Sequence, residues 1–199
     1  MELLQNGFKY TLEGKEKVFR PNMQVAIILY LQANIGLRIG DILSLKLSSF
    51  KGNKLEIRED KTDKLQYRDI DPDITNIIMR YALENNIKKN DSLFKITARA
   101  VQKQLKIVCD YLELENISTH SFRKMYATNQ YEANNNNIEL VKELLNHSSI
   151  ATTQRYIRVS QKEINKASSS YFIYIMIHIF LLELNCTYKI LYTFTLLYL

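Results

Sequence analysis

The sequence predicts an α+β fold that is mainly helical and contains one small antiparallel hairpin. Three observations support this prediction. Most of the chain after residue 70 has apolar residues at helical spacing. Two short stretches with strand composition, 54–58 and 65–70, flank the charged segment EDKTDK, which is typical of a hairpin tip. The chain has 199 residues, 46% of them hydrophobic, which is enough for the core of one globular domain.

Residues 1–20 are polar and show little helix or strand pattern, and the first predicted elements follow them. Residues 21–34, PNMQVAIILYLQAN, predict a buried helix opened by Pro21, because proline is accepted in a first turn. Residues 36–50, GLRIGDILSLKLSSF, follow a glycine break and again have apolar residues at roughly helical spacing. We therefore expect a second helix there.

Helices are predicted throughout the part that follows the hairpin. Their expected ranges are 72–86, 97–113, 120–132, 137–146 and a short one around 152–158. His147 and Tyr156 lie nine residues apart, which would place them on opposite faces of one straight helix. The serines and threonines between them favour caps and turns, so we expect a bend that lets the two side chains converge.

The composition changes abruptly after NKASSS, and we expect one domain over residues 1–167 and a separate tail over 168–199. The tail is apolar and aromatic, and its uninterrupted apolar run, 171–182, is too short to span a bilayer. Three interpretations stay open. The tail is a helix that docks on the body or on a neighbouring subunit, a membrane-associated segment, or a reading frame that continues past its usual stop. The abrupt change favours the last, and a membrane partner is not expected.

Charge and cysteine content narrow the class of function. The net charge is +6 and the pI about 9.1, which favours a polyanionic partner such as nucleic acid. Cys109 and Cys186 are far apart and have no paired spacing, which argues against a disulfide framework or a zinc site. The N-terminus lacks the pattern of a secretory signal. These features together fit a cytoplasmic protein.

Side chains in four stretches can act together on a phosphodiester. The stretches GLRIG, EDKTDK, THSFRK and LLNHSSIATTQRYI supply Arg38, Lys61, Lys64, His120, Arg123, His147 and Tyr156. Arginines present planar donor forks that match phosphate oxygens, histidines donate or shuttle protons, and a tyrosine hydroxyl can be a nucleophile. The pattern indicates attack by tyrosine on a phosphodiester, with arginines neutralising the transition-state charge and no metal ligand set beside them.

The stretches GLRIGDILSLKLSSF, KTDK, HSFRKMYAT and LLNHSSIATTQRYI resemble the four motifs of the tyrosine recombinases, or phage-type integrases. The resemblance covers roughly residues 22–165 and is closest to compact integrase-like proteins of low-GC bacteria. It implies a DNA breaking-rejoining catalytic domain that works through a 3′-phosphotyrosyl intermediate, without metal or nucleotide cofactor. It also implies double-stranded DNA and other copies of the chain as partners, expected as a tetramer on DNA at the nucleoid.

The resemblance gives each site residue a role. Arg38 and Arg123 would contact the non-bridging oxygens of the phosphate. His120 takes the position of an acid or base, and His147 takes a second hydrogen-bonding position at the phosphate. Tyr156 takes the position of the nucleophile. Any one of these residues has an ordinary structural explanation alone, so the interpretation depends on the whole set in its order.

The hairpin tip offers two candidates for one catalytic lysine, and three other positions differ from the common pattern. Lys61 matches the lysine that acts as general acid toward the 5′-oxygen, and Lys64 is a rival for that role. Asn146 and Asp63 stand where many members have glycine, and Lys124 stands where many have histidine. None of these changes removes a catalytic group.

The front of the chain is the larger departure. Many family members carry a separate helical DNA-binding domain before the catalytic one, and only 37 residues precede Arg38 here. We therefore expect the catalytic domain without that core-binding domain. The alternative function is a catalytically silent DNA-binding remnant of a mobile-element integrase.

Overall fold

The structure, a computed structural model, describes residues 2–58, 65–157 and 165. Residues 1–157 form one compact unit, which excludes the chain from residue 158 on. The predicted boundary at residue 167 and the whole apolar tail therefore lie outside the described residues. In the part that is described, no helix has both the length and the apolar character needed to cross a bilayer.

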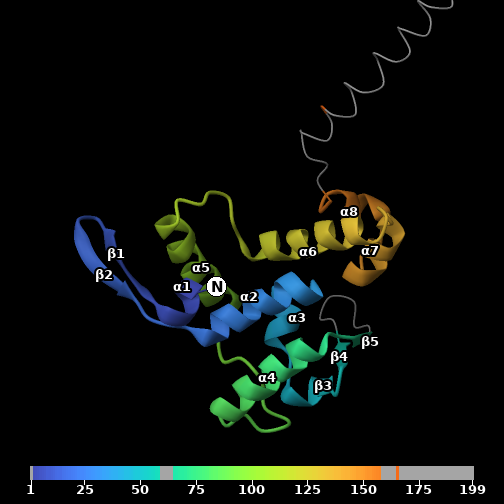
Figure 1. Ribbon diagram of the computed structural model, residues 1–199, viewed down its shortest axis with the longest axis horizontal. Helices are drawn as coiled ribbons and strands as arrows, with labels where there is room; N and C mark the ends of the chain where they lie inside the picture. Colours follow the sequence, from blue (N-terminus) through green and yellow to red (C-terminus); the bar gives the residue numbers. More distant parts are fainter. Residues whose placement is uncertain (1, 59–64, 158–164, 166–199) are drawn as a thin grey trace, which may run out of the picture. The chain divides into compact units, whose positions relative to one another are not determined.

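Helix α2 (Met23–Ile35) is the central element of the first unit and packs against α1, α3, α5 and α6 (Figure 1). Eight of its thirteen residues are buried, so it is apolar on nearly every side. It begins two residues after the predicted Pro21, because the side chain of Asn22 accepts the N–H of Val25 and caps the first turn. Gly36 ends the helix in the left-handed conformation.

The first twenty residues are ordered into elements that the sequence analysis missed. They are α1 (Glu2–Asn6), β1 (Phe8–Leu12) and β2 (Lys15–Phe19), with the two strands paired antiparallel. Glu13 and Gly14 both have positive φ, 52° and 72°, as a two-residue hairpin turn requires. The rings of Phe8 and Phe19 stack at 5.0 Å across the strands. The alternation in FKYTL followed by EG was the available signal.

The predicted helix over 36–50 is wrong in extent. The segment forms α3 (Ile39–Leu43), a 3-10 turn η1 (Leu47–Ser49) and the short strand β3 (Phe50–Lys51). The backbone beyond Ser44 bonds to a distant segment instead of continuing the helix. The carbonyl of Leu45 accepts the N–H of Leu93 at 3.0 Å, and the N–H of Ser48 donates to Lys89 at 2.7 Å. These long-range bonds have no local sequence signature.

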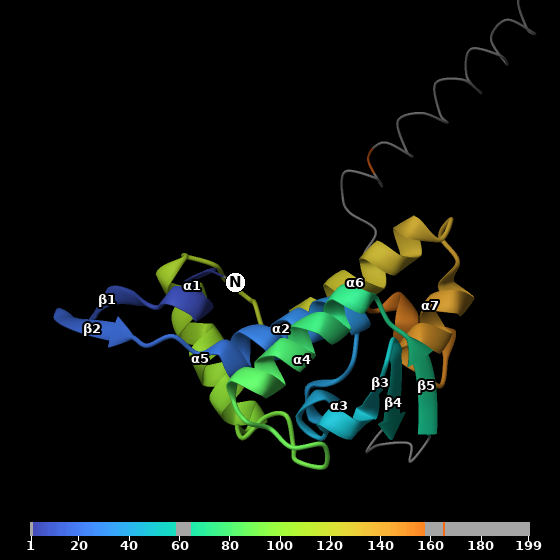
Figure 2. The same ribbon diagram turned by 60° about the horizontal axis from the view of Figure 1, so that its bottom comes forward.

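The predicted hairpin is confirmed as β4 (Lys54–Arg58) and β5 (Leu65–Asp69), which extend β3 into an antiparallel sheet in the order β3-β4-β5 (Figure 2). Leu55 and Ile57 alternate along β4 and turn one face of the sheet toward the core. The tip, with Lys61 and Lys64, lies outside the described residues. Helix α4 (Pro72–Glu84) follows directly, capped by the side chain of Asp71.

The remaining predicted helices are present with small shifts at their ends. They are α5 (Ala98–Tyr111), α6 (Thr119–Ala133), α7 (Ile138–Leu145) and α8 (Ile150–Gln154). Helix α8 begins earlier than predicted because the hydroxyl of Ser149 caps it. The main core surrounds α2, and a smaller apolar cluster joins α6 and α7, with Tyr156 and Ile157 packed against it. The α+β, mainly helical fold class is confirmed.

Candidate active site

Arg38 lies in the turn that joins α2 to α3. Gly36 has φ 71°, and its N–H donates to the carbonyl of Gln32 at 3.1 Å, which closes α2 with a left-handed cap. A Cβ added to Gly36 would lie 2.2 Å from the ring of Tyr126, so this ring packs directly on the glycine. Leu37 is fully buried, and this anchor fixes where the following Arg38 leaves the backbone.

The side chain of Arg38 is 22% exposed and pairs with Asp41. Its Nη1 lies 3.8 Å from a carboxylate oxygen of Asp41, and that carboxylate is 2% exposed. The pair holds the guanidinium at the start of α3 while part of it still faces solvent. The sequence analysis missed Asp41, although a spacing of three residues in a predicted helix was an available signal.

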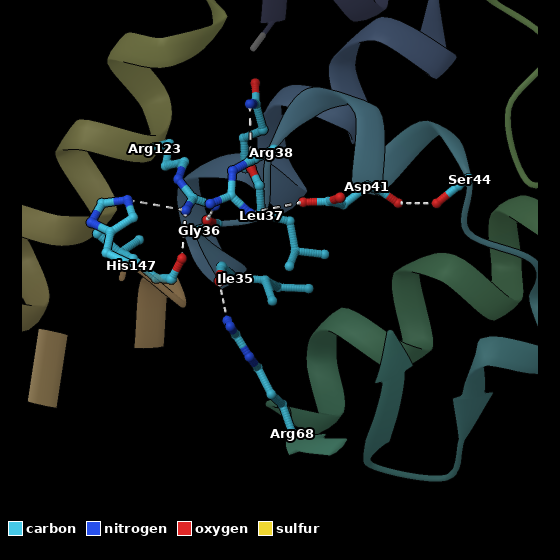
Figure 3. Close-up of polar contacts among 11 residues, drawn as sticks. Ile35, Gly36, Leu37, Arg38, Asp41, Ser44, Arg68, Arg123 and His147 are labelled. Carbon is cyan, nitrogen blue, oxygen red and sulfur yellow. Dashed lines mark hydrogen bonds and ion pairs between the residues drawn. The ribbon is translucent and has the colours of Figure 1, made fainter. Parts of the chain in front are cut away.

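Arg123 lies on α6 and is almost completely buried, with 1% of its surface exposed. Its Nη1 donates to the carbonyl of Gly36, and its Nη2 donates to the carbonyl of Leu145 at 2.7 Å (Figure 3). These two carbonyls lie at the C-terminal ends of α2 and α7, where the helix dipole concentrates negative charge. One guanidinium therefore ties two helix ends together, and the turn that carries Arg38 is part of this contact.

Two further side chains satisfy the carbonyls on either side of Gly36. Arg68 on β5 donates from Nη1 to Ile35 at 3.2 Å, and Gln32 donates from Nε2 to Leu37 at 3.4 Å (Figure 3). Three consecutive carbonyls at the end of α2 are thus bonded by side chains from three elements. No local signal in the sequence could have identified Arg68, because its partner lies 33 residues away.

The end of α7 places His147. The N–H of His147 donates to Lys142 and that of Asn146 donates to Glu143, both at 3.0 Å, which is the hydrogen-bond pattern of a Schellman motif. Asn146 has φ 49° and ψ 51°, a left-handed conformation that asparagine tolerates better than most residues. This explains how asparagine can stand where many of the tyrosine recombinases that the sequence resembles have glycine. The motif leaves the carbonyl of Leu145 for Arg123.

His147 is 8% exposed and contacts three of its neighbours. Its Nε2 lies 3.4 Å from Nη2 of Arg123, and its Nδ1 lies 3.0 Å from the hydroxyl of Thr153. Its ring centroid lies 4.8 Å from that of Tyr156, with the planes tilted by 59°. The predicted bend and the convergence of His147 with Tyr156 are therefore confirmed. Tyr156 follows α8 and packs half-buried on the small cluster of α6 and α7.

His120 stands apart from this group. Ser118 caps α6 and its N–H donates to the hydroxyl of Ser121 at 3.1 Å, while Thr119 begins the helix and is fully buried. His120 is exposed in the first turn, whereas Arg123, three residues later, is buried. Within the described residues, the structure thus brings Arg123, His147 and Tyr156 into contact and leaves His120 at the surface.

The arginines also shape the electrostatics of the neighbouring Tyr126. Burial raises the pKa of the Tyr126 phenol, and the positive charges of Arg68 and Arg123 oppose that rise. The ring therefore stays neutral near pH 7 and acts as packing for Gly36. In the part of the chain that is described, no cluster of three His, Cys, Asp or Glu side chains is arranged to hold a metal ion.

Comparisons with known proteins identify relatives of this chain. The phage integrase family profile matches residues 15–163. The probable integrase/recombinase YoeC of Bacillus subtilis strain 168 is 29% identical over 160 residues, which is 75% of this chain and 85% of YoeC. A probable integrase/recombinase of Acholeplasma phage L2 is 27% identical over 143 residues, 64% of this chain and 46% of that protein. The chain thus spans about half the length of some relatives and most of the length of another.

Solved structures show the same fold. A XerH site-specific recombinase in a post-cleavage complex with palindromic difH substrate matches with a TM-score of 0.64 at 20% identity, over 77% of this chain and 48% of that one. The XerA recombinase matches with a TM-score of 0.56 at 18% identity, over 78% of this chain and 65% of that one. The family match covers most of the chain, and its fold agrees with these structures. The chain therefore belongs to the phage integrase family of tyrosine recombinases.

Proposed function

We propose that the chain is a site-specific DNA recombinase that cleaves and rejoins DNA strands through a 3′-phosphotyrosyl intermediate. The observation that carries the proposal is the contact of Arg123, His147 and Tyr156, residues that come from two separate motifs of the sequence. Arg38 adds a second guanidinium at the turn to which Arg123 is bonded. Fixed cations and a tyrosine hydroxyl are the groups that such a phosphodiester transfer needs.

The proposed step exchanges one ester for another. The Tyr156 oxygen attacks phosphorus, the bond from phosphorus to the 5′-oxygen breaks, and that oxygen leaves as a 5′-hydroxyl after it takes up a proton. The tyrosine proton is assigned to His120, which takes the acid/base position but lies exposed in the first turn of α6, so this step requires Tyr156 and His120 to come together when DNA binds. A 5′-hydroxyl from a partner strand reverses the step, so the exchange needs no external energy source. Arg38 and Arg123 stabilise the charge on the non-bridging oxygens.

The acid that protonates the 5′-oxygen is assigned to Lys61, with Lys64 as the rival. Both lie at the tip of the β4–β5 hairpin, outside the described residues. The proposal also requires a movement, because Arg123 is 1% exposed and a phosphate oxygen reaches it only after a neighbouring segment shifts. Duplex DNA and further copies of the chain, as a tetramer on DNA at the nucleoid, complete the proposal. The net charge of +6 supports salt-sensitive binding to phosphates.

The test is a nicked suicide substrate built from the DNA that flanks the gene, with a denaturant-resistant protein–DNA band as the readout. We expect the wild-type chain to form the band and Tyr156→Phe to abolish it, while DNA affinity measured by gel shift stays nearly unchanged. Tyr131→Phe is the matched control, because Tyr131 packs on the same small cluster and should keep the adduct. An equal adduct yield from Tyr156→Phe would remove the nucleophile assignment. DNA binding without any wild-type adduct would support the silent remnant instead.

A further inference from the structure

We propose that Thr153 is a positioning residue that holds both His147 and Tyr156. Thr153 lies on α8 with no exposed surface. Its hydroxyl lies 3.0 Å from Nδ1 of His147. Its carbonyl accepts the backbone N–H of Tyr156 at 2.8 Å and that of Ile157 at 3.1 Å. One buried residue thus contacts the imidazole through its side chain and the tyrosine turn through its backbone.

The hydrogen bonds of His147 define which nitrogen carries the proton. A guanidinium has donors and no acceptor, so Nε2 of His147 accepts from Nη2 of Arg123 across their 3.4 Å contact. The neutral imidazole then carries its proton on Nδ1, and Nδ1 donates to the Thr153 hydroxyl. The Arg123 contact therefore places the proton on Nδ1, and the Thr153 hydroxyl stabilises this tautomer by accepting from the buried Nδ1–H.

This arrangement has a consequence for the proposed chemistry. Since Nδ1 stays bonded to Thr153, Nε2 is the nitrogen that can gain a proton and donate it to a phosphate bound at Arg123. The ring of His147 also contacts the ring of Tyr156 at 4.8 Å, so a rotated imidazole would disturb the phenol. Thr153 acts through His147 and does not itself contact the phosphate.

Three variants of the full chain separate the hydroxyl from the packing. Thr153→Val keeps nearly the same volume and removes the hydroxyl, and Thr153→Ser keeps the hydroxyl and removes the methyl group. Thr152→Val is the matched control one residue away, because the Thr152 hydroxyl contacts Ser149 at 3.0 Å and not His147. Nitrogen-15 NMR of the imidazole rings reports the tautomer directly. The chain has only three histidines, and the His147 signals are those lost in His147→Gln.

The expected spectra distinguish these variants. We expect the Nδ1-protonated tautomer in the wild-type chain, in Thr153→Ser and in Thr152→Val. Thr153→Val should shift the population toward the Nε2-protonated tautomer. An Nε2-protonated His147 in the wild-type chain, or an unchanged tautomer in a folded Thr153→Val, would overturn the proposal. If Thr153→Val does not fold, Thr153→Ala removes the same hydroxyl and takes its place in the comparison with wild type and Thr153→Ser.

Adduct formation provides a second readout, which rests on the proposed function. Thr153→Val should slow adduct formation about tenfold, the size expected from one lost neutral hydrogen bond. Thr153→Ser should restore the rate to within about twofold of wild type, because it keeps that hydrogen bond. An equal loss in Thr153→Ser and Thr153→Val would assign the effect to packing. A wild-type chain with the expected tautomer and no adduct would contradict the proposed function and leave the Thr153 assignment standing.

Discussion

The two arginines that the sequence assigns to one phosphate are held in opposite ways. Arg38 is 22% exposed and pairs with a carboxylate at 3.8 Å. Arg123 is 1% exposed and donates to the backbone carbonyls of two helix ends. Arg38 and Arg123 are assigned the same contact with the phosphate, yet they differ in exposure and in the groups that bond them. The region around Arg123 combines a candidate chemical role with a role in folding, whereas the region around Arg38 is an accessible turn.

The largest expected effect tests this difference through stability. Arg123→Ala leaves the carbonyls of Gly36 and Leu145 without their guanidinium, and we expect the free energy of unfolding to fall by roughly 3–5 kcal/mol. Arg38→Ala should lower it by less, roughly 1–2 kcal/mol, because the arginine side of this long ion pair is partly solvated while the Asp41 carboxylate stays buried without it. Urea unfolding followed by circular dichroism measures both. Equal losses in the two variants would contradict the comparison.

A second prediction concerns Gly36, which belongs to both regions. Gly36→Ala places a Cβ at φ 71° and 2.2 Å from the ring of Tyr126, and we expect a loss of roughly 2–4 kcal/mol in unfolding free energy. Gly14→Ala is the matched control, because Gly14 has φ 72° and no atom lies within 4 Å of the added Cβ. The control should lose only about 1 kcal/mol. A similar loss in both variants would mean that the Tyr126 ring does not fix the turn.

Local patterns explain which parts of the fold the sequence could predict. Strand 54–58 was predicted with its observed ends, because alternating burial and a charged tip are properties of the segment itself. Helix α4 was predicted from its start at Pro72, where Asp71 provides the cap. The prediction for segment 36–50 failed because its backbone bonds to residues 41 to 48 positions later, as in Ser48 with Lys89 and Leu45 with Leu93. Local reasoning succeeds where the partners of a segment are close in sequence.

The same limit applies to the candidate site. The convergence of His147 with Tyr156 was predicted, because the capping residues that bend the chain lie between them. The burial of Arg123 was not predicted, since its carbonyl partners lie 87 and 22 residues away. Thr153 was identified only as a turn-forming residue, although its contact with His147 spans just six residues. Sequence reasoning identified the residue types of the site and missed the contacts that hold them.

The smallest expected effect isolates the backbone conformation at the end of α7. Asn146→Gly and Asn146→Ala both remove the amide side chain, so their difference reports the cost of the left-handed conformation at φ 49°. We expect the free energy of unfolding of Asn146→Ala to be about 1 kcal/mol lower than that of Asn146→Gly. Urea unfolding followed by circular dichroism measures both values.

Asn146 lies between the Leu145 carbonyl that Arg123 binds and the ring of His147. A strained cap should therefore weaken the Arg123 contact, and adding Arg123→Ala should make the two Asn146 variants more alike in stability. If the difference between them is the same with and without Arg123, the cap and the guanidinium act independently, and the burial of Arg123 does not depend on how α7 ends.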